Sequence, residues 1–308
     1  MNRVATFGNY QSALLDLMTA QTRAADAQER VSTQKNATDL TGFGRQSETL
    51  TALKGAQSRI QGFIDTAKAV SARLTTQDLA MSQVSDGIAG LREAVGGVLA
   101  SDSAGSLMLE LEGKFQAIRG GLTMRHHGAY LFSGASTSTS PLTVANLTEL
   151  AAAPDVPSVF VNDTLKTASR VAESTTLETG FLADELGSEV LEILRDIQIY
   201  HTGANGPLNG KVTDAQKTFL TTQLARLEQA ATGVIDKMAK TGSMANQVES
   251  ITRGHQAQLG SLDELVSDRT DADMAVAITD LQLSQVAIQA SAQVISQLRQ
   301  VSLLNYLT

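Results

Sequence analysis

Three groups of side chains in this sequence are of types that could bind a metal ion or move a proton. His126 and His127 are adjacent, His255 stands alone, and Asp271 and Asp273 are separated by one residue. A zinc site needs three or four converging His, Cys or carboxylate ligands. Neighbouring residues on a helix or strand point in different directions, the chain has no cysteine, and no carboxylate pair lies close to the histidines in sequence. We therefore predict no metal site, and we expect His126 and His127 at the surface or in a turn.

The other candidates have simpler structural explanations. Asp271 and Asp273 directly precede an apolar, periodic segment, where acidic residues complement the dipole of a helix. His255 falls on the apolar seam of a long predicted helix and is expected to pack there. The sequence has no nucleophile elbow and no phosphate-binding loop. It therefore predicts no catalytic residue, no cofactor and no enzymatic activity.

Composition narrows the class of protein. The chain has 308 residues, a net charge of −8, no cysteine and only 4% aromatic residues. An acidic chain is a poor match for nucleic acid, since phosphate contacts require clustered Lys and Arg. No apolar run is long enough to span a membrane. The first residues lack the apolar core and cleavage site of a signal peptide, so we expect any export to proceed without one.

Two long helices are predicted from the spacing of apolar residues. All four prolines lie between positions 141 and 207, so the flanking segments contain no helix breaker. Steps of three and four residues from Leu53 to Val98 meet one polar position, Gln77, and a second seam runs from Leu220 to Val266. Such spacing is typical of long packed helices or coiled coils. We expect the two rods to pack against each other, with a bend near Gly96 and Gly97.

The two ends of the chain carry shorter seams, and the middle has a different pattern. Segment 137–182 is rich in Ser, Thr and Val between turn residues, which favours short strands. The predicted fold is mainly α, with long antiparallel helical rods formed by the N- and C-terminal segments and a small β-rich insertion at the tip. The predicted domains are a terminal coiled coil (1–40 with 270–308), a helical rod (41–136 with 183–269) and the insertion (137–182).

The terminal seams include large apolar side chains that one partner helix would not cover. The last seven residues, 302–308, carry no charged side chain, although exposed apolar residues at a chain end are a liability. We therefore predict that both ends form contacts between subunits. The predicted assembly residues are Phe7, Tyr10, Leu14, Leu17, Ile288, Ile295, Leu298, Leu303, Leu304, Tyr306 and Leu307.

Three stretches resemble the flagellin superfamily. "AQERVSTQKNATDLTGFG" is similar to the end of the family's first helix, although Gln34 stands where glycine is common. The C-terminal "DADMAVAITDLQLSQVAIQASAQVISQLRQVSLLNYL" resembles the family's ending. Within the superfamily, "HGAYLFSGASTSTSPL" (127–142) is similar to a stretch of the hook–filament junction proteins, the third hook-associated protein.

This resemblance implies a structural subunit of the bacterial flagellum that joins hook to filament. It implies an extracellular protein exported through the flagellar type III channel, which assembles with copies of itself into a ring or short helical layer. The implied partners are a hook-side junction protein, flagellin, and an export chaperone on the C-terminal helix. The alternatives are a flagellin of the filament itself and, from another class, a cytoplasmic coiled-coil interaction protein.

Overall fold

The computed structural model describes residues 2–304, and side chains between positions 8 and 299. The chain forms two compact units, one from residues 1–60 with 258–308 and the other from residues 61–257. We call these unit 1 and unit 2. The predicted division into three domains stays a prediction. No helix in the described part of the chain is both long and apolar enough to cross a membrane.

The protein is mainly α-helical, as the apolar periodicity indicates. The helices are α1 (Asn2–Thr33), α2 (Ser47–Ser101), α3 (Leu107–Leu122), α4 (Leu147–Ala152), α5 (Ala183–Thr202), α6 (Asp214–Thr270) and α7 (Met274–Leu304). Two short 3-10 helices are η1 (Thr41–Gln46) and η2 (Pro157–Val159). Four strands form two antiparallel pairs, β1 (Arg125–His126) with β2 (Ala129–Tyr130) and β3 (Ala168–Ala172) with β4 (Thr175–Glu178).

Helix α6 begins at a capping signal in the sequence. Thr213 Oγ1 accepts a hydrogen bond from Gln216 N at 3.3 Å, and Gln216 Oε1 accepts one from Thr213 N at 3.0 Å, so the pair forms a capping box at the start of α6. Helix α2 continues through Gly96 and Gly97 to Ser101, so it does not break at these glycines.

The core of unit 2 follows the two predicted seams. From Ala67 to Val98, every seam position of α2 is buried, and α6 buries Leu220, Leu227, Val234 and Val248. Contacts between the helices include Thr241 Oγ1 to Met81 Sδ at 3.7 Å. The core continues into α3 and α5. Gly87 of α2 and Gly121 of α3 allow these two helices to approach closely. A Cβ at Gly87 would lie 2.4 Å from Ile118 Cγ1 of α3.

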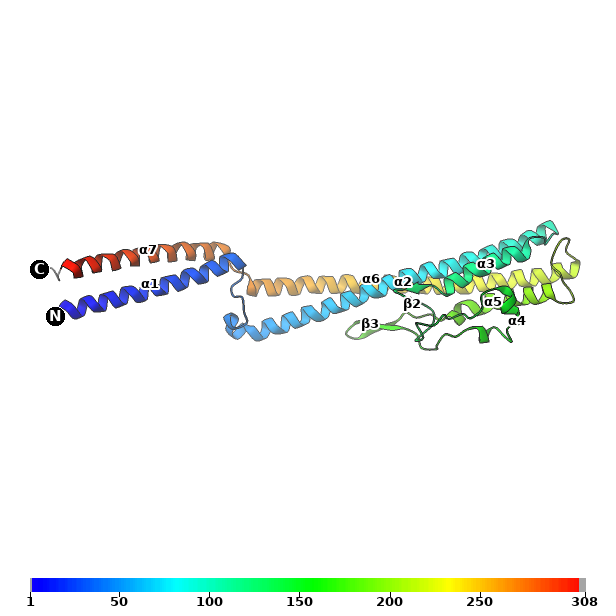
Figure 1. Ribbon diagram of the computed structural model, residues 1–308, viewed down its shortest axis with the longest axis horizontal. Coiled ribbons are helices and arrows are strands. Elements are labelled where there is room, and N and C mark those ends of the chain that lie inside the picture. Colours follow the sequence, from blue (N-terminus) through cyan, green and yellow to red (C-terminus); the bar gives the residue numbers. More distant parts are fainter. Residues whose placement is uncertain (1, 305–308) are drawn as a thin grey trace. The chain divides into compact units, whose positions relative to one another are not determined.

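The segment between residues 137 and 182 differs from its prediction. Only β3 and β4 are strands, while α4 and η2 occupy stretches expected to be extended. Five of its buried apolar residues belong to the same core as the long helices: Leu142, Val144, Val156, Val159 and Val171. Burial of these side chains requires the segment to lie along the helices (Figure 1).

The predicted place of this segment at the tip of the rods is therefore not confirmed, since its apolar side chains share the core of the long helices. Its hairpin lies against α6, where His255 Nε2 and Val171 O are 2.9 Å apart. One end of unit 2 is closed by two loops, the loop between α2 and α3 and the loop that precedes α6. There Ala104 N donates to Gly210 O at 2.7 Å, and Val212 N donates to Asp102 O at 3.1 Å.

The polar seam residue Gln77 generates a stability prediction. Its side chain is fully buried, and neither amide atom finds a hydrogen-bond partner among the described residues. A buried unsatisfied polar group costs about 1–3 kcal/mol. We expect Gln77→Leu to raise the free energy of unfolding by about that amount in denaturant titrations. As a control one turn away, Leu74→Ala should lower it by about 2–5 kcal/mol. A destabilised Gln77→Leu variant would show that the amide is needed in the seam.

Candidate assembly surface

Helices α1 and α7 of unit 1 pack side by side and antiparallel (Figure 1). Arg30 near the end of α1 forms an ion pair of 3.0 Å with Asp280 near the start of α7. The seam positions of both helices follow alternating steps of four and three residues. They are Ala13, Leu17, Ala20, Ala24 and Ala27 on α1, and Ala277, Leu281, Ser284, Ile288, Ser291, Ile295 and Leu298 on α7, all buried or half-buried.

Small side chains dominate this seam and let the helices approach closely. Ala13, Ala20, Ala27, Ala277 and Ser284 are its most buried members, and Cα atoms of the two helices come within 8 Å of each other. The distance between packed helices depends on the side chains at their contact. The buried seam positions hold alanine or serine, while the larger seam residues such as Leu17 and Ile288 stay half-buried.

Larger apolar residues outside the seam remain at the surface of the helix pair. Their exposed fractions range from 42% to 63%, and they are Leu14, Leu15 and Met18 on α1 and Val276, Ile278, Leu283, Val286 and Val294 on α7. We call these eight residues the apolar rim. Scattered exposed leucines are ordinary, and the rim residues lie on more than one side of the pair, since Leu283 also lines the groove described next. Extensive exposed apolar surface is typical of interaction sites.

Charged residues gather on one flank of the pair. A groove of about 720 Å³ is lined by Asp16, Arg23, Asp26 and Arg30 of α1, and by Asp280, Leu283 and Ala287 of α7, among others. Successive helical residues are about 100° apart, so Leu14 and Met18 lie across the seam from Asp16 and Arg23. One flank of α1 is therefore charged and the other apolar.

The predicted assembly residues fall into three groups. Tyr10, Leu17, Ile288, Ile295 and Leu298 are half-buried between α1 and α7, while Leu14 belongs to the apolar rim. The side chains of Phe7, Leu303 and Leu304, and the whole of Tyr306 and Leu307, lie outside what the structure describes. A role of these eleven residues in assembly stays a prediction.

The prediction omitted the most exposed members of the rim. Leu15, Met18, Leu283 and Val286 are each more than half exposed. The available signal was the presence of large apolar residues between seam positions. The C-terminal segment shows this signal clearly, since Leu283, Val286 and Val294 all lie off its seam.

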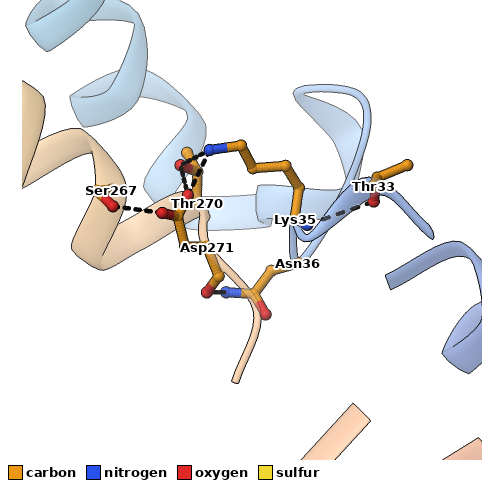
Figure 2. A network of polar contacts seen from close by, with 6 residues as sticks. All are labelled: Thr33, Lys35, Asn36, Ser267, Thr270 and Asp271. Atoms are coloured by element: carbon orange, nitrogen blue, oxygen red, sulfur yellow. Dashed lines mark hydrogen bonds and ion pairs between the residues drawn. The ribbon is translucent and has the colours of Figure 1, made fainter. Parts of the chain in front are cut away.

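A polar network in unit 1 joins the end of α1 to the connection between α6 and α7 (Figure 2). The backbones form a short antiparallel bridge, in which Asn36 N donates to Thr270 O at 2.7 Å and Ala272 N donates to Gln34 O at 3.0 Å. Lys35 forms an ion pair with Asp271, and Asn36 Nδ2 donates to Asp271 O at 2.8 Å. The two chain segments that lead into the α1–α7 pair are thereby fastened to each other.

Asp271 is the charged centre of this network. It accepts hydrogen bonds from Lys35, from Ser267 and from Thr270. The bond from Lys35 is the largest cause that lowers the pKa of Asp271 to about 2, followed by the bond from Ser267. The side chain of Asp271 therefore forms an ion pair with Lys35, whereas the sequence predicted that it would cap a helix.

The other chemically notable residues have structural roles. Asp273 Oδ1 caps α7, accepting from Ala275 N at 2.9 Å and Val276 N at 3.2 Å. His255 stacks on Phe63 with ring centroids 5.5 Å apart. His126 is the last residue of β1, and His127 lies in the turn that follows it. Among the residues that the structure describes, no group of three or more His, Asp or Glu side chains could hold a metal ion.

Gln34 ends α1 in a conformation that suits glycine. Its φ of 58° lies in the left-handed region, and its N–H donates to Arg30 O at 2.9 Å. A residue of this kind after the last turn is a common helix ending, usually provided by glycine. The backbone at Gln34 therefore adopts a conformation that glycine takes without strain.

Comparisons with known proteins agree with the terminal motifs. A family model for the bacterial flagellin C-terminal helical region matches residues 224–307. A protein assigned as a flagellar hook-associated protein of Vibrio parahaemolyticus aligns with a TM-score of 0.61 and 17% identity, covering 75% of this chain and 100% of that chain. FlgL of Bacillus cereus aligns with a TM-score of 0.54 and 16% identity, covering 70% and 98% respectively.

FlgL of Xanthomonas campestris gives a TM-score of 0.56 and 14% identity, covering 70% of this chain and 99% of that chain. A search among curated protein sequences finds no match. At these identities the three structures establish a shared fold. Together with the C-terminal match, they confirm the resemblance to the flagellin superfamily and, in fold, to its hook-associated proteins.

The left-handed residue after α1 gives a prediction about stability. A left-handed conformation costs a residue with a Cβ about 1–2 kcal/mol, and glycine adopts it freely. We expect Gln34→Gly to raise the free energy of unfolding of the chain by up to about 1 kcal/mol, since glycine also gains entropy when unfolded. Gln28→Gly, at an exposed position inside α1, is the matched control and should destabilise by about the same amount. Destabilisation by both variants would contradict this role of Gln34.

The Lys35–Asp271 pair gives a prediction about pH. Because the folded-state pKa of Asp271 is lowered to about 2, its contribution to stability is present above the unfolded value of about 3.9 and is lost as the pH falls toward 2. Thermal unfolding between about pH 5 and pH 2 should show this loss in the wild type and much less of it in Asp271→Asn. Equal acid sensitivity of both proteins would rule out the pair as its source.

Proposed function

We propose that this chain is a structural subunit of the bacterial flagellum and forms the junction between hook and filament. The observation that carries the proposal is the apolar rim on the α1–α7 pair, which has no partner among the described residues of its own chain. The flagellin C-terminal match includes all of α7 that the structure describes. The fold shared with hook-associated proteins supports the junction over other places in the organelle.

Subunit packing through the rim is energetically reasonable. Complete burial of a leucine or methionine side chain contributes about 1.5–3 kcal/mol. The rim residues are each roughly half exposed, so contacts with neighbouring subunits would gain a large part of this energy at several positions on each copy. A contact repeated around a ring or short helical layer adds these gains for every subunit.

The proposed partners follow from this position. Copies of the chain would contact each other through α1 and α7, with a hook-side junction protein on one side of the layer and flagellin on the other. The protein would act outside the cell after export through the flagellar type III channel. An export chaperone on the C-terminal helix would cover its apolar surface before assembly.

A filament flagellin is the second candidate, because the matching family model describes the C-terminal region of flagellin. The two candidates predict different flagella when the chain is missing. Loss of a junction protein leaves hooks without filaments. Loss of one flagellin in an organism that has several often leaves filaments in place.

The proposed test combines this deletion with a rim variant. In a strain that lacks the gene, electron microscopy should show hooks without filaments, and the wild-type chain should restore filaments. Leu15→Asp combined with Leu283→Asp should fail to restore them, because a charge in a dry contact costs more than the lost burial. The purified variant should melt like the wild type, since both side chains are 63% exposed in the isolated chain.

Leu109→Asp is the matched control. Leu109 of unit 2 is 79% exposed and lies outside the apolar rim, so its variant should restore filaments. Filaments restored by the double rim variant would contradict the role of the rim. Filaments present in the deletion strain would favour the flagellin alternative.

A further inference from the structure

Unit 1 has a second pocket, which is lined by the loop after α1, the start of α2 and the end of α6. Its volume is about 440 Å³, and its apolar wall contains Leu40, Phe43 and Val266. Leu40 is 47% exposed, and the other two are half-buried. The exposed side chain of Lys54 belongs to the same pocket. Apolar walls with a few charged groups are typical of binding sites.

The remaining charged groups of the pocket already have partners. Lys35 pairs with Asp271 (Figure 2), and Asp39 Oδ1 accepts a hydrogen bond from Gly42 N at 2.8 Å. Lys54 forms no ion pair with the residues that the structure describes. A ligand that combines an apolar group with an acid would therefore fit this pocket.

Another side of α6 presents side chains of this chemistry. Leu265 is 43% exposed. Successive helical residues are about 100° apart, so Leu265 points about 100° away from Val266 and about 140° away from Thr270, which both line the pocket. The exposed Asp268 follows Leu265 by three residues and the exposed Glu264 by four, so the three side chains form one surface. We call Glu264, Leu265 and Asp268 the acidic knob.

The acids of the knob are available to a cation from outside the chain. Neither Glu264 nor Asp268 forms an ion pair among the described residues, and like charges four residues apart on a helix repel each other. Arg269 is next to them in sequence, but its guanidinium turns back on α6, where Nη1 donates to Leu265 O at 3.0 Å. An external lysine would therefore relieve the repulsion between the two acids.

Knob and pocket also share the apolar surface that the rim does not explain. Among the described side chains of unit 1, Leu40 and Leu265 are the large apolar residues that are exposed outside the apolar rim. One lines the pocket and the other forms the knob. A contact between the two would cover both leucines and bring Lys54 to Asp268.

We propose that the acidic knob of one copy of the chain enters the Lys54 pocket of a second copy. This inference deepens the proposed self-assembly and rests on it. Knob and pocket lie on different sides of unit 1, so each copy gives its knob to one neighbour and its pocket to the next. A head-to-tail contact of this kind closes into a ring or continues as a helical layer, depending on the rotation between copies.

Cross-linking tests the contact directly, since the chain has no cysteine. A chain with Leu40→Cys and Leu265→Cys carries both halves of the contact. Flagella restored by this variant and treated with a short bismaleimide should give a ladder of linked copies, whereas either single variant should give none. Restored flagella without a ladder would overturn the proposal, and this is also the result expected if another protein fills the pocket.

A charge exchange provides a second test. Lys54→Glu and Asp268→Lys should each lower the number of filaments restored to the deletion strain several-fold, because each places like charges at the contact. The combined variant restores an opposite pair and should restore the filaments. Lys68→Glu is the matched control, because this exposed lysine of α2 lies outside the pocket and its variant should act like the wild type. Full restoration by both single variants would overturn the proposal.

The two tests separate this inference from the proposed function. A deletion strain that keeps its filaments contradicts the junction, and the ladder in flagella that contain the chain then decides the contact between knob and pocket. A deletion strain without filaments, together with restored flagella that give no ladder, supports the junction and overturns the contact.

Discussion

Close packing of α1 against α7 through alanine and serine is the constraint on which unit 1 depends. A seam with Ala13, Ala20 and Ala27 facing Ala277 and Ser284 buries little apolar area on each helix. Burial of apolar area is the main stabilising term in folding. The pair therefore gains only part of the stability that its composition could provide, and the remainder is available to contacts outside the chain.

Unit 2 shows the opposite solution with a different pair of long helices, α2 and α6. Its seam contains Leu74, Met81, Ile88 and Leu91, all fully buried, and the core extends to Phe115 and Phe132. Large side chains fill the space between helices here, so the unit needs no further partner for its core. The difference between the two seams separates a unit whose core is filled by large side chains from one that leaves the apolar rim exposed.

The sequence predicts most of unit 2 correctly and the ends of the chain less well. Large residues at three- and four-residue steps define one register, and from Ala67 to Val98 that register matches the buried face. At the N-terminus, the predicted assembly residue Leu14 is exposed, and the structure buries Ala13, Ala20 and Ala27 against α7 instead. Hydrophobic size favoured the leucine, whereas close helix approach favours alanine.

Tertiary contacts account for the other differences. The position of segment 137–182 along α2 and α6 depends on shared burial of residues such as Val171, which local patterns do not reveal. The pairing of Lys35 with Asp271 joins residues far apart in sequence, and the acidic residue next to a helix start looked like a cap. The positive φ of Gln34, by contrast, is consistent with the sequence motif, because glycine is common at this position and favours that conformation.

The central claim is that the apolar rim is buried between subunits, and the absence of cysteine allows a direct test. Met18→Cys places the only thiol of the chain at a rim position that is 57% exposed in the isolated subunit. A thiol-specific maleimide should label the purified variant rapidly. The account predicts that the same position in intact flagella is protected and becomes reactive again when the flagella are dissociated. Equal labelling in flagella and in the isolated subunit would contradict it.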